Sequence, residues 1–104
     1  MKNVAFHYIY RDGANYKNFH AEIFKNPSGM NIDDIRLLIK QKFIGEEYFY
    51  ASKLQVPDLH FGSWDEEFDH EFHEFAAIEY TDEPPNTLLN LGEFVTLIKN
   101  TNWI

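Results

Sequence analysis

The chain has 104 residues, of which 44% are hydrophobic and 17% aromatic, with a formal net charge of −8 and no cysteine. This length fits one domain over residues 1–104, and the apolar bulk is sufficient to close a core. The lack of cysteine excludes disulfides and thiolate metal sites, and no apolar stretch has the length of a signal peptide or a membrane span. We therefore expect a cytoplasmic protein that binds no membrane and, because of its negative charge, no nucleic acid.

The first elements along the chain form a hairpin. Residues 3–10 alternate in hydrophobicity and are rich in β-branched and aromatic types, which predicts a strand. Residues 11–15 have turn chemistry, because Asp, Gly and Asn tolerate positive φ, and residues 19–24 then predict a second strand. The apolar residues of this second strand share one face: Phe19, Ala21 and Ile23.

A helix is predicted over residues 32–44. Asn31 can cap it, acids occupy its first turn, and Lys40 and Lys42 lie in its last turn, as the helix dipole favours. Gly45 suits a left-handed position after the helix. Apolar residues at helical spacing form the predicted buried stripe: Ile32, Ile35, Leu38, Ile39 and Phe43.

Residues 46–61 are harder to classify. Tyr48 and Tyr50 alternate with their neighbours for a few residues, and Pro57 then stops regular pairing. This pattern indicates a short strand followed by an ordered loop.

Two further elements are predicted in the second half of the chain. Residues 75–81 favour a strand because of their β-forming composition, and the acidic, proline-rich residues 82–85 close it. Residues 91–99 have apolar positions at helical spacing, and Asn90 with Glu93 forms a capping box before them. The sequence therefore ends with a second amphipathic helix.

Residues 61–75 contain aromatic rings, two histidines and several carboxylates, and two structures are open for them. In a helix, side chains three and four positions apart are neighbours and could together ligate zinc. The side chains that would share this face are Glu66, His70, His73 and Glu74.

The alternative is a short helical turn at 63–68 followed by a strand from about 70 to 81, and this is the structure that we expect. No helix stop separates the histidines from residues 75–81. In strict alternation His70 and His73 point to opposite faces of the strand. A shared metal ion would then require a β-bulge between them.

A divalent metal is the one cofactor that this composition allows. Its candidate ligands are His60, His70 and His73, with a carboxylate from Asp65, Asp69 or Glu74. Such a site also needs surrounding hydrogen bonds that the sequence does not reveal. We expect the histidines to anchor sheet and loop instead, so no cofactor is predicted.

Two groups of polar residues are candidate binding residues. The first lies in the predicted hairpin loop and comprises Arg11, Asp12, Asn15 and Tyr16. Turn chemistry alone also explains Asp12 and Asn15, and Arg11 can pair with an acid from residues 65–83. The second is Trp64 with Asp65, where the ring could stack on a ligand or anchor the loop onto the core.

The sequence holds no familiar catalytic signature, such as a phosphate-binding glycine loop, a nucleophile elbow or a metalloprotease HExxH. No serine stands in the context of a nucleophile. We therefore do not expect an enzyme.

Five segments resemble a group of short, uncharacterised bacterial and phage proteins. They are YIYRDGANYKN (8–18), FKNP (24–27), VPDLHF (56–61), DHEFHEF (69–75) and EYTDEPP (79–85). The resemblance spans most of the chain and implies a shared fold. It implies no activity and no catalytic residues.

These observations predict an α+β fold, in which a small antiparallel sheet of three or four strands carries both helices on one face. Some aromatic residues exceed what one small core needs, namely Tyr8, Tyr10, Phe24, Tyr48 and Tyr50. We expect them to form a patch for self-association or for a protein partner. The leading function is a small acidic protein-interaction module. The alternatives are a His/carboxylate metal-binding or hydrolase-like protein, and a decoy that imitates nucleic-acid charge with the acidic residues 65–83.

Overall fold

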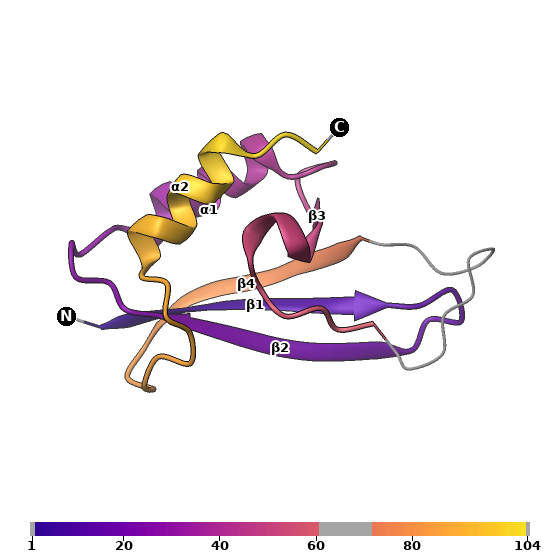
Figure 1. The fold of residues 1–104 in the computed structure, drawn as a ribbon, viewed down its shortest axis with the longest axis horizontal. Coiled ribbons are helices and arrows are strands. Elements are labelled where there is room, and N and C mark those ends of the chain that lie inside the picture. Colours follow the sequence, from indigo (N-terminus) through magenta and orange to yellow (C-terminus); the bar gives the residue numbers. More distant parts are fainter. Residues whose placement is uncertain (1, 61–71, 104) are drawn as a thin grey trace.

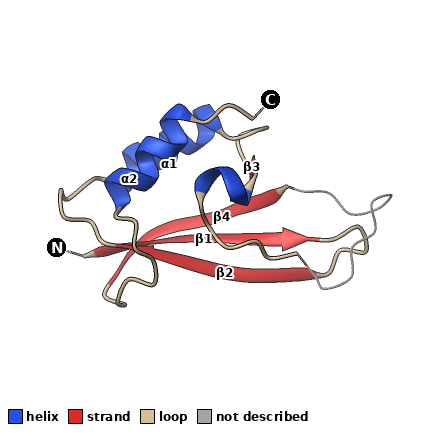
Figure 2. Cartoon of the chain, viewed as in Figure 1, coloured by secondary structure: helices blue, strands red, loops and turns tan. Residues whose placement is uncertain are grey.

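The four strands of the sheet are antiparallel and lie in the order β2-β1-β4-β3. The structure is a computed structural model that describes residues 2–60 and 72–103. Both helices and a short 3-10 helix cover one face of the sheet, and the other face is open (Figures 1 and 2). The elements are β1 (Asn3–Arg11), β2 (Lys17–Phe24), α1 (Ile32–Lys42), β3 (Tyr48–Phe49), the 3-10 helix (Ala51–Leu54), β4 (His73–Thr81) and α2 (Leu91–Asn100). The predicted α+β fold is confirmed.

The core lies between the covered face of β1 and the two helices. Val4, Phe6, Tyr8 and Tyr10 share this face, as their alternation predicts, and all four are buried. The ring of Phe6 lies at the centre, with ring centroids 5.0–6.4 Å from those of its aromatic neighbours. These neighbours are Tyr8, Phe43, Phe49, Phe75 and Phe94.

Both helices begin for the reasons that the sequence indicates, and α1 ends with Phe43 in extended conformation, before the left-handed Gly45. The Asn31 side chain accepts the Asp33 N–H at the start of α1, and Asn90 and Glu93 form the capping box of α2. The predicted stripe of α1 faces the core, although the helix ends at Lys42 rather than at residue 44. Gly45 has the expected positive φ, 58°.

The strand β2 turns its apolar side away from the helices. Register with β1 places Phe19, Ala21 and Ile23 on the open face, where Phe19 is 74% exposed. Lys17 is also on the open face, and the covered face carries four residues: Asn18, His20, Glu22 and Phe24. The alternation predicted for β2 is therefore right, but the face of β2 that is covered is mostly polar.

The predicted aromatic patch is wrong for three of its five members. Tyr8, Tyr10 and Phe24 are buried, because residues after the 3-10 helix extend the covering layer along the sheet and Phe24 stacks on Phe94 at 4.4 Å. Of the predicted members Tyr48 is 36% exposed, and the most exposed aromatic side chains of the described chain are Tyr16, at 69%, and Phe19, at 74%.

A β-bulge changes the alternation of β4. His7 pairs with Ala77, but Tyr8 pairs with Phe75, so Ala76 is an extra residue opposite β1. His73 and Phe75 therefore face the helices together with Ile78, and Glu74 faces the open side. The strict alternation expected for this strand, which separates Phe75 and His73 from Ile78, is wrong for this reason.

The segment from β3 to residue 60 follows the predicted short strand and ordered loop, with one element that the sequence did not indicate. This element is the 3-10 helix, whose Ala51 and Leu54 are buried in the core. Gln55 ends it with a positive φ of 56°, and the chain then crosses the covered face as residues 56–60 (Figure 1).

Residues 82–90 connect β4 to α2 by way of the outer edge of β2. Asn3 Nδ2 donates to the Glu83 carbonyl, and Asn86 then exchanges hydrogen bonds with the backbone of Ile23. The Leu91 N–H donates to the Lys25 carbonyl, which starts α2 on the covered face. The connection thus protects one end of the β2 edge.

Replacing Phe6 by Ala tests the position of the core. We expect Phe6→Ala to lower the free energy of unfolding by about 3–5 kcal/mol, because it leaves a cavity among five rings. Leu88→Ala, which truncates a fully exposed side chain in the connection between β4 and α2, is the control and should change it by about 0.5 kcal/mol or less. Urea denaturation of both variants measures the difference, and similar losses would contradict this core.

Candidate functional site

The covered face of the sheet becomes polar toward the hairpin end. Beyond Phe6, the side chains under residues 56–60 include Tyr8, His20, Glu22 and His73. Glu22 is only 4% exposed and pairs with His20 Nε2 at 2.7 Å, and His73 is 1% exposed. Buried polar and ionisable groups are costly, so their concentration at one end of a small core marks a candidate functional site.

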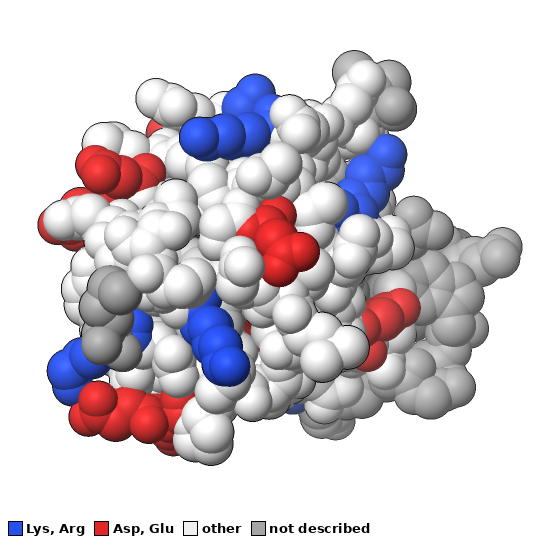
Figure 3. Space-filling model, turned by 60° about the vertical axis from the view of Figure 1, so that its left-hand side comes forward, with Lys and Arg blue, Asp and Glu red and all other residues white. Residues whose placement is uncertain are grey.

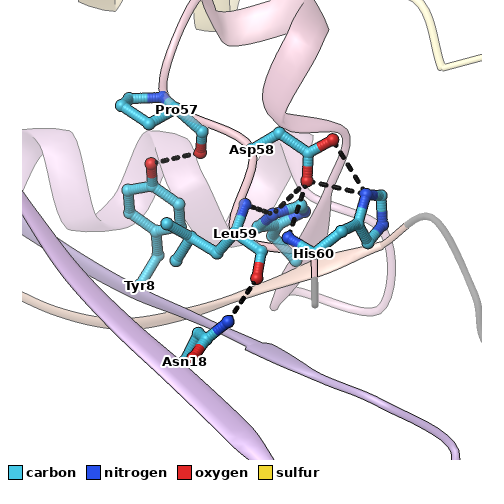
Figure 4. Close-up of polar contacts among 7 residues, drawn as sticks. Tyr8, Asn18, Pro57, Asp58, Leu59 and His60 are labelled. Carbon is cyan, nitrogen blue, oxygen red and sulfur yellow. Dashed lines mark hydrogen bonds and ion pairs between the residues drawn. The ribbon is translucent and has the colours of Figure 1, made fainter. Parts of the chain in front are cut away.

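Side chains from three strands hold the backbone of residues 57–59 in place (Figure 4). The Tyr8 hydroxyl of β1 donates to the Pro57 carbonyl at 2.6 Å, and Asn18 Nδ2 of β2 donates to the Leu59 carbonyl at 2.7 Å. The Leu59 N–H donates to His73 Nε2 of β4 at 3.0 Å. Asp58 lies within this fixed segment and His60 directly follows it, so the segment also positions these two side chains.

The bond from Leu59 determines the protonation state of His73 in this arrangement. A ring nitrogen that accepts an N–H carries no proton, so the imidazole is neutral with its proton on Nδ1. Asp58 Oδ1 lies 3.5 Å from the same Nε2.

Asp58 and His60 form a carboxylate–imidazole pair. The His60 N–H donates to Asp58 Oδ1 at 2.9 Å, and its Nδ1 donates to Oδ2 at 2.8 Å. Because Nδ1 carries the proton in this bond, Nε2 is the basic nitrogen of the ring. The His60 ring also packs edge-on against Tyr10, with ring centroids 4.3 Å apart, and 5.4 Å from the centroid of His73.

Asp58, His60 and His73 line a hollow of about 420 Å³. The rest of its lining combines apolar and hydroxyl-bearing side chains: Tyr50, Ala51, Ser52 and Val56. The Asp58 side chain is 60% exposed, so its carboxylate is accessible from solvent. A hollow of this size and composition suits a small ligand or one side chain of a partner.

The electrostatics of the hollow favour a charged carboxylate and an uncharged phenol. Partial burial alone would raise the pKa of Asp58, but hydrogen bonds from the His60 backbone and ring lower it. Burial, followed by the negative charges of Glu22 and Asp58, raises the pKa of Tyr8 well above its ordinary value of 10.0. Asp58 is therefore ionised at neutral pH, and Tyr8 remains a hydrogen-bond donor.

The structure brings together two of the three predicted metal-ligating histidines, His60 and His73. Glu74, a candidate carboxylate, points to the opposite face and pairs with Arg11 at 2.9 Å. The remaining candidates lie outside the described residues: Trp64, Asp65, Asp69 and His70. Within residues 2–60 and 72–103, no group of three or more His, Asp or Glu side chains is placed to hold a metal ion. The metal site stays a prediction.

The predicted binding residues of the hairpin loop serve the turn and do not line the hollow. Asp12 Oδ1 accepts the N–H groups of Ala14 and Tyr16, each at 2.9 Å, and Asn15 has a positive φ of 68°. Arg11 pairs with Glu74, as expected for an acid from residues 65–83. No contact of this loop suggests a ligand.

Sequence reasoning missed Asp58 and Tyr8 as members of the site. The signal for Asp58 was present, because an Asp two residues before a His can accept that residue's backbone N–H and turn the chain. No sequence signal marks Tyr8, because the Pro57 carbonyl that accepts its hydrogen bond is distant in the sequence. Only the fold joins the two.

Replacing Tyr8 by Phe tests the anchoring of residues 57–59. We expect Tyr8→Phe to lower the free energy of unfolding by about 1–2 kcal/mol, because the Pro57 carbonyl loses its donor. Since the raised pKa keeps Tyr8 protonated longer in the folded than in the unfolded state, stability should fall above about pH 10, and less so in the variant. Urea denaturation at pH 7 and at pH 10.5 measures both effects.

The control for this variant is Tyr16→Phe, which removes the hydroxyl of an exposed tyrosine. It should change stability by about 0.5 kcal/mol or less at pH 7. An equal loss in both variants would mean that the Tyr8 hydroxyl does not hold the segment.

No protein-family model, curated protein or solved structure matches the chain. In the described part of the chain, every helix is too short or too polar to cross a bilayer. The comparisons therefore leave the resemblance to uncharacterised bacterial and phage proteins as an expectation, and the candidate function depends on the geometry around Asp58.

Proposed function

We propose that the chain is a small protein-binding module whose hollow beside Asp58 receives a basic side chain of its partner. The observation that supports this most is the accessible carboxylate of Asp58, which three strands hold at a fixed place through the backbone of residues 57–59. Preorganised anchors of this kind reduce the entropy lost on binding.

The charge of Asp58 is available for a partner. Among the described residues, its ion-pair contacts are with the two imidazoles His60 and His73, and no Lys or Arg pairs with it. His73 is neutral while it accepts from Leu59. A carboxylate with no Lys or Arg beside it can still attract an ammonium or guanidinium group, and a charge-assisted hydrogen bond is stronger than a neutral one.

The lining of the hollow suits the rest of a basic side chain. Lys and Arg have apolar stems, and Val56, Ala51 and the Tyr50 ring offer apolar and aromatic surface beside Asp58. Arg also stacks on aromatic faces. The site would therefore bind the stem and the charged head together.

The charge distribution on one described face fits recognition at one carboxylate better than imitation of nucleic acid. On the face shown in Figure 3, acidic side chains lie in separate groups with Lys and Arg between them. A decoy of nucleic acid would instead present a continuous acidic field. On that face the acidic interaction module is the better supported of the two hypotheses.

Titration with blocked amino acids tests this function. We expect Nα-acetyl-arginine amide and Nα-acetyl-lysine amide to shift the backbone amide signals of residues 56–60 in ¹⁵N NMR spectra, with dissociation constants of the order of 1 mM. Asp58→Asn should weaken binding about tenfold, because it removes the charge but keeps an acceptor for the His60 N–H.

Two controls separate charge recognition at this site from general attraction to an acidic protein. Asp82→Asn removes an exposed carboxylate that pairs with Lys2, away from the hollow, and should leave the affinity unchanged. Nα-acetyl-citrulline amide, a neutral analogue of arginine, should not bind. Equal binding of citrulline, or equal weakening by both Asp variants, would refute the proposal.

A further inference from the structure

The outer edge of β2 has backbone groups that point away from β1. Asn86 marks their direction, because the Ile23 N–H donates to its Oδ1 at 2.7 Å and the Ile23 carbonyl accepts its N–H at 3.2 Å. In an antiparallel pair, every second residue of an edge strand points outward in this way. The register from Ile23 to Lys17 contains no shift, so the backbones of Ala21, Phe19 and Lys17 point outward too.

Only part of this edge is protected. Asn86 Nδ2 also donates to the Ala21 carbonyl at 2.9 Å, so Asn86 occupies the edge from Ala21 to Ile23. Among the described residues, nothing bonds the outward N–H and C=O groups of Lys17 and Phe19. The open stretch therefore consists of the outward groups of these two residues and the Ala21 N–H, between Asn86 on one side and the hairpin turn on the other.

The side chains beside the open stretch are apolar and cationic. Phe19 is 74% exposed on the open face of the sheet, and Lys17 lies on the same face two residues away. An exposed aromatic ring next to an unpaired strand edge is unfavourable in an isolated chain.

We propose that this edge pairs with the same edge of a second copy of the chain, across a two-fold axis at Asn18. Antiparallel pairing in this register sets Lys17 opposite the second copy's Phe19, and Phe19 opposite the second copy's Lys17. The four outward groups of each copy then meet four of the other, and the contacts of Asn86 remain intact. The two sheets become one continuous sheet.

Self-complementarity favours a second copy over an unrelated partner. In this register no like charges lie opposite each other, and each Lys17 ammonium can lie over the Phe19 ring of the other copy, a favourable cation–π contact. A C2 interface requires a patch that is complementary to itself in this way.

Sedimentation equilibrium of the full chain tests the proposal. We expect a reversible equilibrium between one and two chain masses, and an association constant lowered at least tenfold by Phe19→Ala. Tyr16→Ala is the matched control, because Tyr16 is also an exposed aromatic residue but precedes the strand. It should leave the association unchanged.

A charge exchange tests the register itself. Lys17→Glu alone should abolish association, because it removes the cation over the ring. Lys17→Glu combined with Phe19→Lys should restore association, because each Glu then lies opposite the second copy's Lys. Circular dichroism confirms that each variant is folded, which is expected because both side chains point away from the core.

A wild-type chain that stays at one mass up to millimolar concentration would overturn the proposal, as would a dimer that Phe19→Ala leaves intact. A double variant that stays monomeric would overturn the register. The hollow at Asp58 lies on the other face of the sheet, so its ligand binding is measured independently of these outcomes.

Discussion

Because β1 lies between β2 and β4, its covered face must fill the space beneath both helices, and the ring of Phe6 fills the middle of that space. Phe43 and Phe94 reach it from the helical side of the core, and Phe49 and Phe75 from the other half of the sheet. Aromatic rings in offset and edge-to-face contact bury large areas in a small volume. This packing allows a chain without disulfides to form a stable core at this length.

The strand β1 also spans the boundary between the apolar core and the candidate site. Two residues after Phe6, the Tyr8 ring still packs in the core, but its hydroxyl reaches the backbone of Pro57. From there on the covering layer is an extended segment rather than a helix, and an extended segment has backbone groups that need partners. Asn18 and His73 supply the other two. The residues beneath this extended segment are therefore polar because they bond its backbone.

Local chemistry made the helices and the first hairpin predictable from sequence. Asn31, Asn90 and Glu93 cap their helices through short-range bonds, and alternation in β1 indicates the buried face directly. Features that depend on distant partners could not be predicted in this way. The extra residue at Ala76 arises from pairing with β1, and no local pattern distinguishes it from regular strand. Without it, His73 would face away from Leu59.

The candidate site also has residues that local sequence marks and residues that only distant partners place. The sequence marks His60 and His73 as candidate metal ligands, whereas it marks Asp58 only as part of a loop. The pairing of Arg11 with Glu74 was foreseeable from charge alone. The partners of the backbone at 57–59 come from three strands, so only the folded chain reveals that this short segment is fixed.

The path of residues 82–90 has a consequence for the order in which the chain folds. A short turn joins β1 and β2, so this hairpin can close within microseconds, whereas β4 must first find β1 across most of the chain length. Asn86 reaches Ile23 only after β4 has docked. Until then the whole length of β2 is unprotected, and a nascent chain whose last third is still being synthesised is most prone to aggregate at this strand.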